Sequence, residues 1–377
     1  MPTGEVLEGI AKNEKFSGIA AVSGMAPVCN LDGVSAATPF AIHSVGKILS
    51  GVLMVEMVAQ GIVSEAALIT PGIKLPPEVA TKLAASSLDS EEKSKVKGDV
   101  VERLSQVSIL QAMTHKANLG DYLSNYTNHL LAGGAEKGSM IDMVEFAGNN
   151  WQPDYSNDGM LFGSLALQQL YNERTGADLS YENILQKLVI EPSETAISMV
   201  KTAAVHFKAE DSEHVAKFPA TPAGGHFASV DDLLQLGKYL YERCKNPDFM
   251  AAVTKYGGEF YSEKRNRIEH SGYMEGSTGE KSSSVVECGV SLDDGKVIVV
   301  FNDRDASLVD RKEGGVTRPY AQDFYRELRT SLEQEKAENK QFWAEKMAEK
   351  RSGVKLGSFV EQVMKDKEKV ADGVPKL

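Results

Sequence analysis

The chain has 377 residues, of which 42% are hydrophobic and 25% are charged. These are ordinary proportions for a globular protein, and the length predicts about two domains. The formal net charge of −12 argues against a general nucleic-acid-binding protein, because such a protein needs a basic surface to displace the counterions of the phosphate backbone.

The first predicted element is a β-hairpin. Two short apolar runs, Phe16 to Val22 and Ala26 to Leu31, are separated by the turn residues Ser23 and Gly24, a pattern typical of paired strands. Glutamates precede this segment, whereas a secretory signal has a basic lead without acidic residues. The chain also has no run of about 18 apolar residues, the length that a membrane span needs. We therefore expect a soluble protein, cytoplasmic or otherwise, with no signal peptide and no membrane span.

An apolar helix follows the hairpin. Residues 39–43 predict an extended lead-in, and the chain from Ser44 to about Gly61 predicts a helix. Between Ile48 and Val58 only Glu56 is charged. A helix that is apolar around its whole circumference is usually buried in a large core, so we expect this helix to be central.

Ser44 and Lys47 form a Ser-x-x-Lys pair at the start of this helix. Residues three positions apart lie on one helix face, so the hydroxyl and the amine are neighbours. A serine hydroxyl becomes a good nucleophile when a desolvated amine beside it accepts its proton. Of the five Ser-x-x-Lys matches in the chain, only the pair at Ser44 opens an apolar helix. The alternative is that Ser44 is an ordinary N-cap residue, where serine is common.

The middle of the chain predicts helices and loops. The expected elements are a charged surface segment at 64–100, a short helix at 107–113, a loop at 116–139, a short helix at 140–147, a helix at 158–175 ended by Gly176 and a helix at about 180–190 stopped by Pro192.

The hydrophobic period changes in the last third of the chain. The expected elements are a helix at 230–244 capped by Ser229, strands at 267–273, 283–292 and 296–302, and a charged helix at about 318–350. Strands therefore lie near both ends and helices between them. This order predicts an α+β fold, with an antiparallel sheet built from both chain ends, flanked by helices, and an inserted all-helical domain. The predicted domains are a sheet domain of residues 1–63 plus 220–335, the helical domain 64–219 and a charged helical extension 336–377.

A second candidate site motif is the Tyr-x-Asn of Tyr155 and Asn157. It lies in a turn directly ahead of the apolar helix at 158–175, where a turn can direct a hydroxyl and an amide into a cleft. Two other Tyr-x-Asn matches, at Tyr126 and Tyr181, lack this context. The alternative is that Tyr155 is a half-buried packing residue.

A third motif is the His-x-Gly of His270, Ser271 and Gly272 on the predicted strand 267–273. Beside the nucleophile, this strand could offer the Tyr273 N–H as one oxyanion donor and the serine N–H as the other. Gly272 allows a close backbone approach, and a protonated His270 can bind a carboxylate. The alternative is a solvent-facing histidine on a strand.

In this order and context, the three motifs resemble those of the penicillin-binding, class C β-lactamase-like serine hydrolase family, over roughly residues 16–330. The segments 40–47, 109–115, 155–163 and 224–233 are also similar to that family. The resemblance implies a β-lactamase/transpeptidase-like fold. It implies these roles: Ser44 as acyl-accepting nucleophile, Lys47 as its activating partner, Tyr155 as proton shuttle, Asn157 as a ligand of the substrate carbonyl or amide, and His270, Ser271 and Gly272 in the place usually held by Lys-Thr-Gly. Whether Lys47 or Tyr155 is the ground-state base stays open, because close ionisable groups titrate as a unit.

Two departures from the family pattern bear on the substrate. The histidine at 270 looks more like the esterase and peptidase members than the antibiotic-destroying ones, and residues 115–119 read His-Lys-Ala-Asn-Leu where the family often has His-Thr-Ser-Gly-Leu. We expect a serine hydrolase that forms an acyl-enzyme on Ser44 and hydrolyses an ester or amide of a small molecule or peptide, with D-amino-acid peptides as one candidate. The alternative is a non-catalytic binding or scaffold protein on the same fold.

This mechanism needs no cofactor, and the sequence offers no metal motif. The seven histidines include no His-Glu-x-x-His, and the three cysteines include no Cys-x-x-Cys. A glycine-rich stretch at 276–282 partly matches a phosphate-binding loop, but Glu280 interrupts its Gly-Lys-Ser order. The oligomeric state is not predicted.

Overall fold

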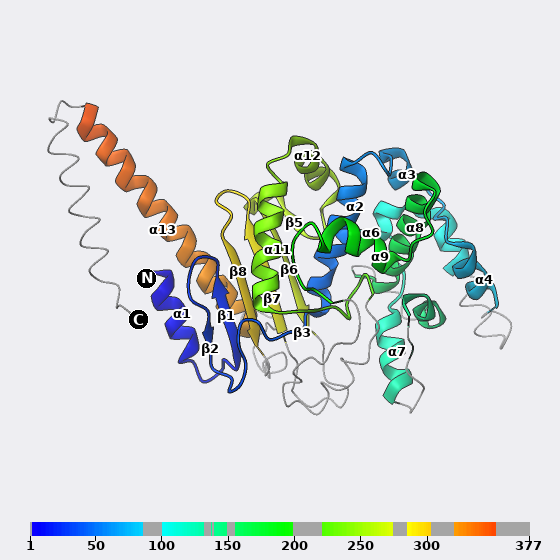
Figure 1. Ribbon diagram of the computed structural model, residues 1–377, viewed down its shortest axis with the longest axis horizontal. Helices are drawn as coiled ribbons and strands as arrows, with labels where there is room; N and C mark the ends of the chain where they lie inside the picture. Colours follow the sequence, from blue (N-terminus) through cyan, green and yellow to red (C-terminus); the bar gives the residue numbers. More distant parts are fainter. Residues whose placement is uncertain are drawn as a thin grey trace. The chain divides into compact units, whose positions relative to one another are not determined.

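The computed structural model describes residues 2–85, 100–131, 137, 139–148, 155–198, 221–273, 285–302 and 320–351. The chain divides into two compact units. The larger unit, Leu7–Tyr325, holds the sheet and the helices around it (Figure 1). The smaller unit combines Met1–Val6 with the chain from Arg326 onward. The domain boundaries expected from the sequence stay predictions.

The larger unit is built on a six-stranded antiparallel sheet with the order β2-β1-β8-β7-β6-β5, and β3 pairs separately with β4. In chain order the strands are β1 (Gly18–Val22), β2 (Val28–Cys29), β3 (Phe40–Ala41), β4 (Phe227–Ala228), β5 (Tyr261–Ser262), β6 (Arg267–Tyr273), β7 (Val285–Ser291) and β8 (Val297–Asn302). The predicted hairpin and the three predicted later strands are present. Because β1 pairs with β8, the sheet joins the two ends of this unit, and the predicted α+β fold class is confirmed.

The helices are α1 (Thr3–Ala11), α2 (Gly46–Ala59), α3 (Glu65–Ile69), α4 (Pro77–Ala85), α6 (Ile109–Met113), α7 (Tyr122–Leu131), α8 (Asn157–Thr175), α9 (Tyr181–Leu185), α11 (Val230–Arg243), α12 (Pro247–Tyr256) and α13 (Tyr320–Arg351). Residues 100–106 are also helical. Four short helical turns are described as well: η1 (His43–Val45), η2 (Met140–Phe146) and η4 (Glu263–Arg265) are 3-10 turns, and η3 (Gln186–Ile190) is a π turn.

Both faces of the central strands are covered. Every residue of β1, β7 and β8 is buried, which explains why these strands are almost continuously apolar. On one face, α11 packs so closely on β8 that a Cβ at Gly237 would lie 2.6 Å from Val297. On the other face, the Tyr325 hydroxyl occupies the space where a Cβ of Gly289 would stand.

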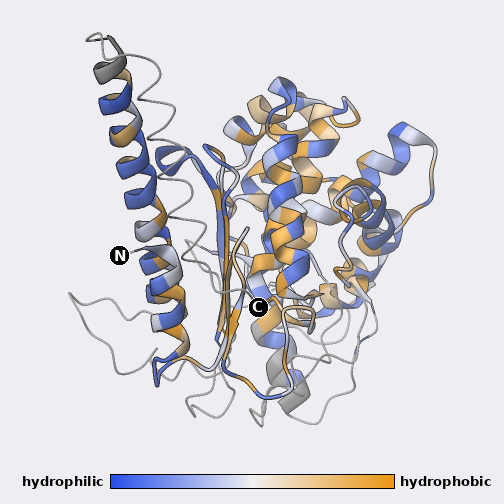
Figure 2. Ribbon diagram, turned by 60° about the vertical axis from the view of Figure 1, so that its left-hand side comes forward, coloured by the Kyte–Doolittle hydropathy of each residue, from blue (hydrophilic) through white to orange (hydrophobic). Residues whose placement is uncertain are grey.

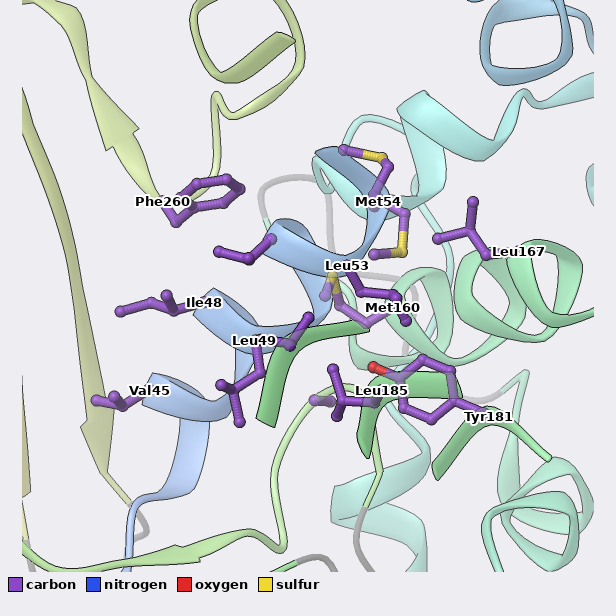
Figure 3. Packing of buried hydrophobic residues seen from close by; sticks show 14 of the residues in the cluster. Val45, Ile48, Leu49, Leu53, Met54, Met160, Leu167, Tyr181, Leu185 and Phe260 are labelled. Carbon is purple, nitrogen blue, oxygen red and sulfur yellow. The ribbon is translucent and has the colours of Figure 1, made fainter. Parts of the chain in front are cut away.

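Helix α2 is the centre of the core. Its residues from Gly46 to Met57 are all buried, as the apolar sequence predicted. Figure 3 shows Val45 and Ile48 pointing toward a strand on one side of α2, and Met160, a residue of α8, lying on the other side. A Cβ at Gly51 would overlap the ring of Phe260. This packing fixes the start of α2 against the sheet.

The acidic side chain on α2, Glu56, is held by side chains of α11. Glu56 is 1% exposed, and its carboxylate accepts hydrogen bonds from Arg243 Nε (2.7 Å), Arg243 Nη2 (2.8 Å) and Tyr239 Oη (3.0 Å). Gln60 Nε2 donates a further bond at 3.1 Å. The carboxylate is therefore paired on several sides, as a buried charge requires.

Two predictions about the helical region were wrong. The predicted loop at 116–139 contains α7, whose Tyr122 and Tyr126 are buried. The predicted surface segment at 64–100 contains α3 and α4, and some of their apolar side chains, Leu68 and Val79 among them, belong to the main core, whereas Ile69 is exposed. Its lysine- and serine-rich part, 86–99, lies outside the described residues.

In the smaller unit, the beginning of α1 is tied to α13. The Thr3 N–H donates to Glu335 Oε1 at 2.5 Å, and Thr3 Oγ1 lies 3.2 Å from Ser331 Oγ. Figure 2 shows α13 as hydrophilic along most of its length, in agreement with the charged helix predicted there. In the described part of the chain, no helix combines the length and the apolar character that crossing a membrane demands.

Candidate active site

The turn η1 places Ser44 at the entrance of α2. His43, directly before it, is buried and has φ 47°, in the left-handed region. A non-glycine residue there costs about 1–3 kcal/mol and persists only where the surroundings enforce it. Here the Ile42 N–H bonds to the His226 carbonyl, and Gly272 packs against the backbone on the other side. The strained turn therefore holds Ser44 in a defined place.

Ser44 does not act as a helix cap. No side-chain cap bond is present at the start of η1 or of α2, and the N-cap residue of α2 is Val45. Instead, Ser44 Oγ lies 2.8 Å from Lys47 Nζ and 2.8 Å from Tyr155 Oη. The hydroxyl thus lies between an amine and a phenol, both within hydrogen-bonding distance.

Lys47 is fully buried. Its Nζ donates to Ser44 Oγ and, at 2.8 Å, to the Ala223 carbonyl, and it lies 4.8 Å from the centre of the Tyr155 ring. Burial lowers the pKa of Lys47 from 10.5 to about 7, against the opposing effect of the negative charges on Glu259 and Asp121. A large fraction of Lys47 is therefore neutral at neutral pH and able to accept a proton.

Tyr155 precedes α8, as predicted. The next residue, Ser156, is the N-cap of α8 and accepts a bond from the Gly159 N–H at 2.9 Å. A Cβ at Gly159 would lie 2.5 Å from the Ala112 carbonyl, so α8 starts in close contact with α6. This contact fixes the turn that brings Tyr155 to Ser44.

Asn157 is buried in the first turn of α8. Its Nδ2 donates to Asp121 Oδ1 at 2.8 Å, whereas its Oδ1 has no hydrogen-bond partner among the described residues. Because a carboxylate only accepts, this pairing fixes which end of the amide is the acceptor. Oδ1 is therefore the end of the amide that is left to accept a further hydrogen bond, and the role of Asn157 in substrate binding stays a prediction.

Strand β6 brings the His-x-Gly motif to the serine. A Cβ at Gly272 would lie 2.5 Å from the Ile42 carbonyl and 2.9 Å from the Ser44 nitrogen, so only glycine permits this approach. Tyr273 follows on the same strand, and its amide stays a predicted oxyanion donor.

The side chains of β6 alternate between its two faces. Ser271 Oγ donates to Glu287 Oε2 on β7 at 2.8 Å, and Gln322 Nε2 lies 3.5 Å from Ser271 Oγ. His270, on the other face, has its Nε2 3.2 Å from Glu259 Oε1. The described contacts of Ser271 thus lead away from Ser44, and its role in substrate binding stays a prediction.

Two residues at this site were not singled out from the sequence. Glu259 lies between α12 and β5, and its Oε1 is 3.0 Å from His115 Nε2. The ring of His115 packs against that of Tyr155, with centroids 4.4 Å apart. His115 belonged to a segment resembling the family, but no local pattern marks Glu259.

The segment after residue 220 closes the buried end of the site. The carbonyls of Ala223 and Pro222 accept from Lys47 and from Ser50 Oγ, each at 2.8 Å, and Tyr122 Oη donates to Thr221 Oγ1 at 2.6 Å. A backbone carbonyl has no sequence signature, so the acceptor for the lysine could not be predicted.

His226 also borders the lysine. It is fully buried, a Cβ at Gly46 would lie 2.6 Å from its Nδ1, and neither ring nitrogen has a hydrogen-bond partner among the described residues. Burial, and then the charge of Lys47, lower the pKa of His226 to about 4. A neutral ring here adds no second positive charge beside the amine.

The described residues contain no cluster of histidine, cysteine, aspartate and glutamate suited to a metal ion. The glycine-rich stretch at 276–282 and the Ser-x-x-Lys matches beginning at Ser90, Ser94 and Ser352 lie outside the described residues.

The chain is similar to known proteins in its fold alone. No protein-family model matches the chain, and no curated protein does so either. One similar solved structure is a D-stereospecific amidohydrolase from Streptomyces sp., with 12% identity, a TM-score of 0.52, and coverage of 80% of this chain and 93% of that one. Another is a penicillin-binding protein from Bacillus halodurans, with 14% identity, a TM-score of 0.52, and coverage of 80% and 95%. The predicted β-lactamase/transpeptidase-like fold is confirmed.

Proposed function

We propose that this chain, which has the fold of the penicillin-binding and β-lactamase-like proteins, is a serine hydrolase that forms an acyl-enzyme on Ser44. The observation that carries the proposal is the 2.8 Å approach of Lys47 Nζ and of Tyr155 Oη to one serine hydroxyl. A buried amine with a lowered pKa beside a hydroxyl is an arrangement that activates a nucleophile.

In the proposed reaction, Ser44 Oγ attacks the substrate carbonyl while its proton passes to Lys47 and Tyr155 acting together. The N–H groups of Ser44 and Tyr273 hold the developing oxyanion. The proton then passes to the leaving alcohol or amine, whose bond to the acyl carbon breaks. Water, activated by the same pair, attacks the acyl-enzyme, and the carboxylic acid leaves as Ser44 recovers its proton.

The substrate is proposed to be an ester or amide of a small molecule or peptide. Asn157 favours an amide, since its Nδ2 is engaged by Asp121 and its Oδ1, which has no partner in the described part of the chain, is proposed to accept a substrate N–H. The solved amidohydrolase of similar fold is D-stereospecific, which keeps D-amino-acid amides and peptides among the first compounds to assay.

The direct test is covalent labelling. A fluorophosphonate should add one adduct to the wild-type protein, and mass spectrometry of its peptides should place that adduct on Ser44. The Ser44→Ala variant should take up no adduct, whereas Ser64→Ala, which alters the exposed N-cap serine of α3, should label like the wild type. An unlabelled wild type, or an adduct on a different serine, would refute the proposal and favour a binding or scaffold protein.

The labelling rate should depend on pH through Lys47. Only the neutral amine accepts a proton, and the neutral fraction grows as the pH rises through the lowered pKa of about 7. The rate constant for labelling of Ser44 should therefore rise between about pH 6 and 8 and then level off. A rate that is flat across this range, or one that rises only near the ordinary lysine pKa of 10.5, would contradict this role.

A further inference from the structure

Glu259 joins two histidines that come from distant parts of the chain. Its Oε1 lies 3.0 Å from His115 Nε2 and 3.2 Å from His270 Nε2. The carboxylate side chain is 22% exposed and the two histidine side chains are 4% and 10% exposed, respectively. One carboxylate oxygen thus faces both rings in a largely buried place, where a charge needs such partners.

His115 leads from this carboxylate to the proposed proton shuttle. Its ring packs on the Tyr155 ring at an interplanar angle of 36°. Its Nδ1 lies 3.1 Å from both the nitrogen and the carbonyl oxygen of Ser156, the residue after Tyr155. The orientation of His115 therefore bears on the ring of Tyr155 and on the backbone directly after it, and the Tyr155 hydroxyl lies beside Ser44.

His270 leads from the same carboxylate to the predicted oxyanion strand. Its Nδ1 donates to the Ser271 carbonyl at 2.6 Å, and its Nε2 faces Glu259. With both nitrogens engaged, the ring has a fixed orientation. Two residues further on, Gly272 packs against the Ser44 nitrogen.

We propose that Glu259 is a positioning residue of this site, whose carboxylate holds His115 and His270 so that Tyr155 and β6 keep their places on either side of Ser44. The inference rests on the proposed function and extends it to a residue whose described hydrogen bonds and ion pairs go to His115 and His270. Burial alone would raise the pKa of Glu259, but the ring nitrogens of His115 and His270 beside its carboxylate outweigh this effect and lower that pKa from 4.5 to about 2. Glu259 is therefore a carboxylate throughout the neutral pH range, as the contact with two histidines requires.

Three variants test this role: Glu259→Ala, Glu259→Gln and the control Glu263→Ala, which removes an exposed glutamate four residues away on η4. Glutamine keeps an accepting oxygen at the same reach, so it should retain the geometry that alanine loses. Fluorophosphonate labelling of Ser44 gives a maximal rate constant, kinact, and a binding constant, KI, for each folded variant. We expect kinact to fall about 100-fold in Glu259→Ala, since small misplacements of reacting groups cost about this much.

The remaining values separate positioning from a structural role. Glu259→Gln should recover kinact to within about tenfold of the wild type, Glu263→Ala should match the wild type, and KI should change little in all three. A residue that only stabilised the fold would shift the unfolding temperature and leave kinact of the folded protein unchanged. If Glu259→Ala does not fold, His115→Phe takes its place in the comparison with Glu259→Gln. Phenylalanine keeps a ring on Tyr155 but lacks the two ring nitrogens. We then expect kinact to fall in His115→Phe and to be retained in Glu259→Gln.

Two results would overturn the inference while the proposed function stands. The first is a wild-type kinact in Glu259→Ala, or in His115→Phe where that variant replaces it. The second is a kinact of Glu259→Gln that is no higher than that of Glu259→Ala or, where it is used instead, of His115→Phe. In both cases the wild type would still be labelled on Ser44 and Ser44→Ala would not. A wild type that takes no label would overturn both proposals together.

Discussion

Replacing Lys47 by methionine should reduce turnover, and the labelling rate of Ser44, by about 10³-fold. The change removes the group expected to take the serine proton, and it corresponds to about 4 kcal/mol in the activation free energy. Methionine has a similar length and fits a fully buried position, so the fold should persist. The variant does leave the Ala223 carbonyl without the Lys47 hydrogen bond, which should lower the free energy of unfolding by about 1 kcal/mol.

The measurement is the labelling time course of Lys47→Met at pH 8, next to circular dichroism and a melting curve. Lys82→Met is the matched control, because Lys82 is a partly buried lysine that bonds to Asp142 and Glu145 instead of to the site. The control should label at the wild-type rate. If Lys47→Met kept more than a tenth of the wild-type rate while folded, Tyr155 would have to act as the base without the lysine.

The largest loss of stability is expected on breaking the buried ion pair between α2 and α11. Arg243→Met removes two hydrogen bonds to a Glu56 carboxylate that is 1% exposed. An uncompensated buried charge typically costs 3–5 kcal/mol. Because the Arg243 side chain is 27% exposed and Tyr239 and Gln60 still bond to Glu56, we expect about 3 kcal/mol less free energy of unfolding, measured by urea denaturation.

Two further variants show whether this loss comes from the stranded charge. The double variant Glu56→Gln/Arg243→Met should recover part of the stability, since a neutral amide is cheaper to bury than a carboxylate. Lys245→Met breaks an exposed pair with Glu242 on the same helix end and should leave the unfolding midpoint unchanged. An equal loss in the double and single variants would mean that lost packing of the arginine stem, not charge, accounts for the effect.

The parts of the site that the sequence predicted are those set by local pattern. Ser44 and Lys47 lie three residues apart where the turn η1 leads into α2, whose apolar sequence predicted its burial. Tyr155 precedes a helix with clear capping and periodicity. Their convergence on one hydroxyl could be inferred only from resemblance to a family. The contact of Glu259 with His115 and His270 depends on long-range packing, which neither period nor spacing encodes.

The errors in secondary structure also have physical causes. The predicted helix at 230–244 ends close to where it was expected, but α12, which follows it, was not predicted. Asn246 is the N-cap of α12, and Pro247 occupies its first turn, where its missing N–H costs nothing. Helix α7 was missed because its sequence is rich in tyrosine and asparagine, which are poor helix formers. Tertiary burial of Tyr122 and Tyr126 overrides this weak local preference.

The pairing of β1 with β8 has a consequence for how the protein is made. Gly18 pairs with Asn302, so partners in adjacent strands are separated by most of the sequence. During synthesis, β1 emerges from the ribosome long before β8, and one of its edges stays bare until then. An unpaired edge of this kind can pair with other chains. In a fragment that ends before Val297, this edge of β1 would have no β8 to pair with. Slow folding is expected from this topology.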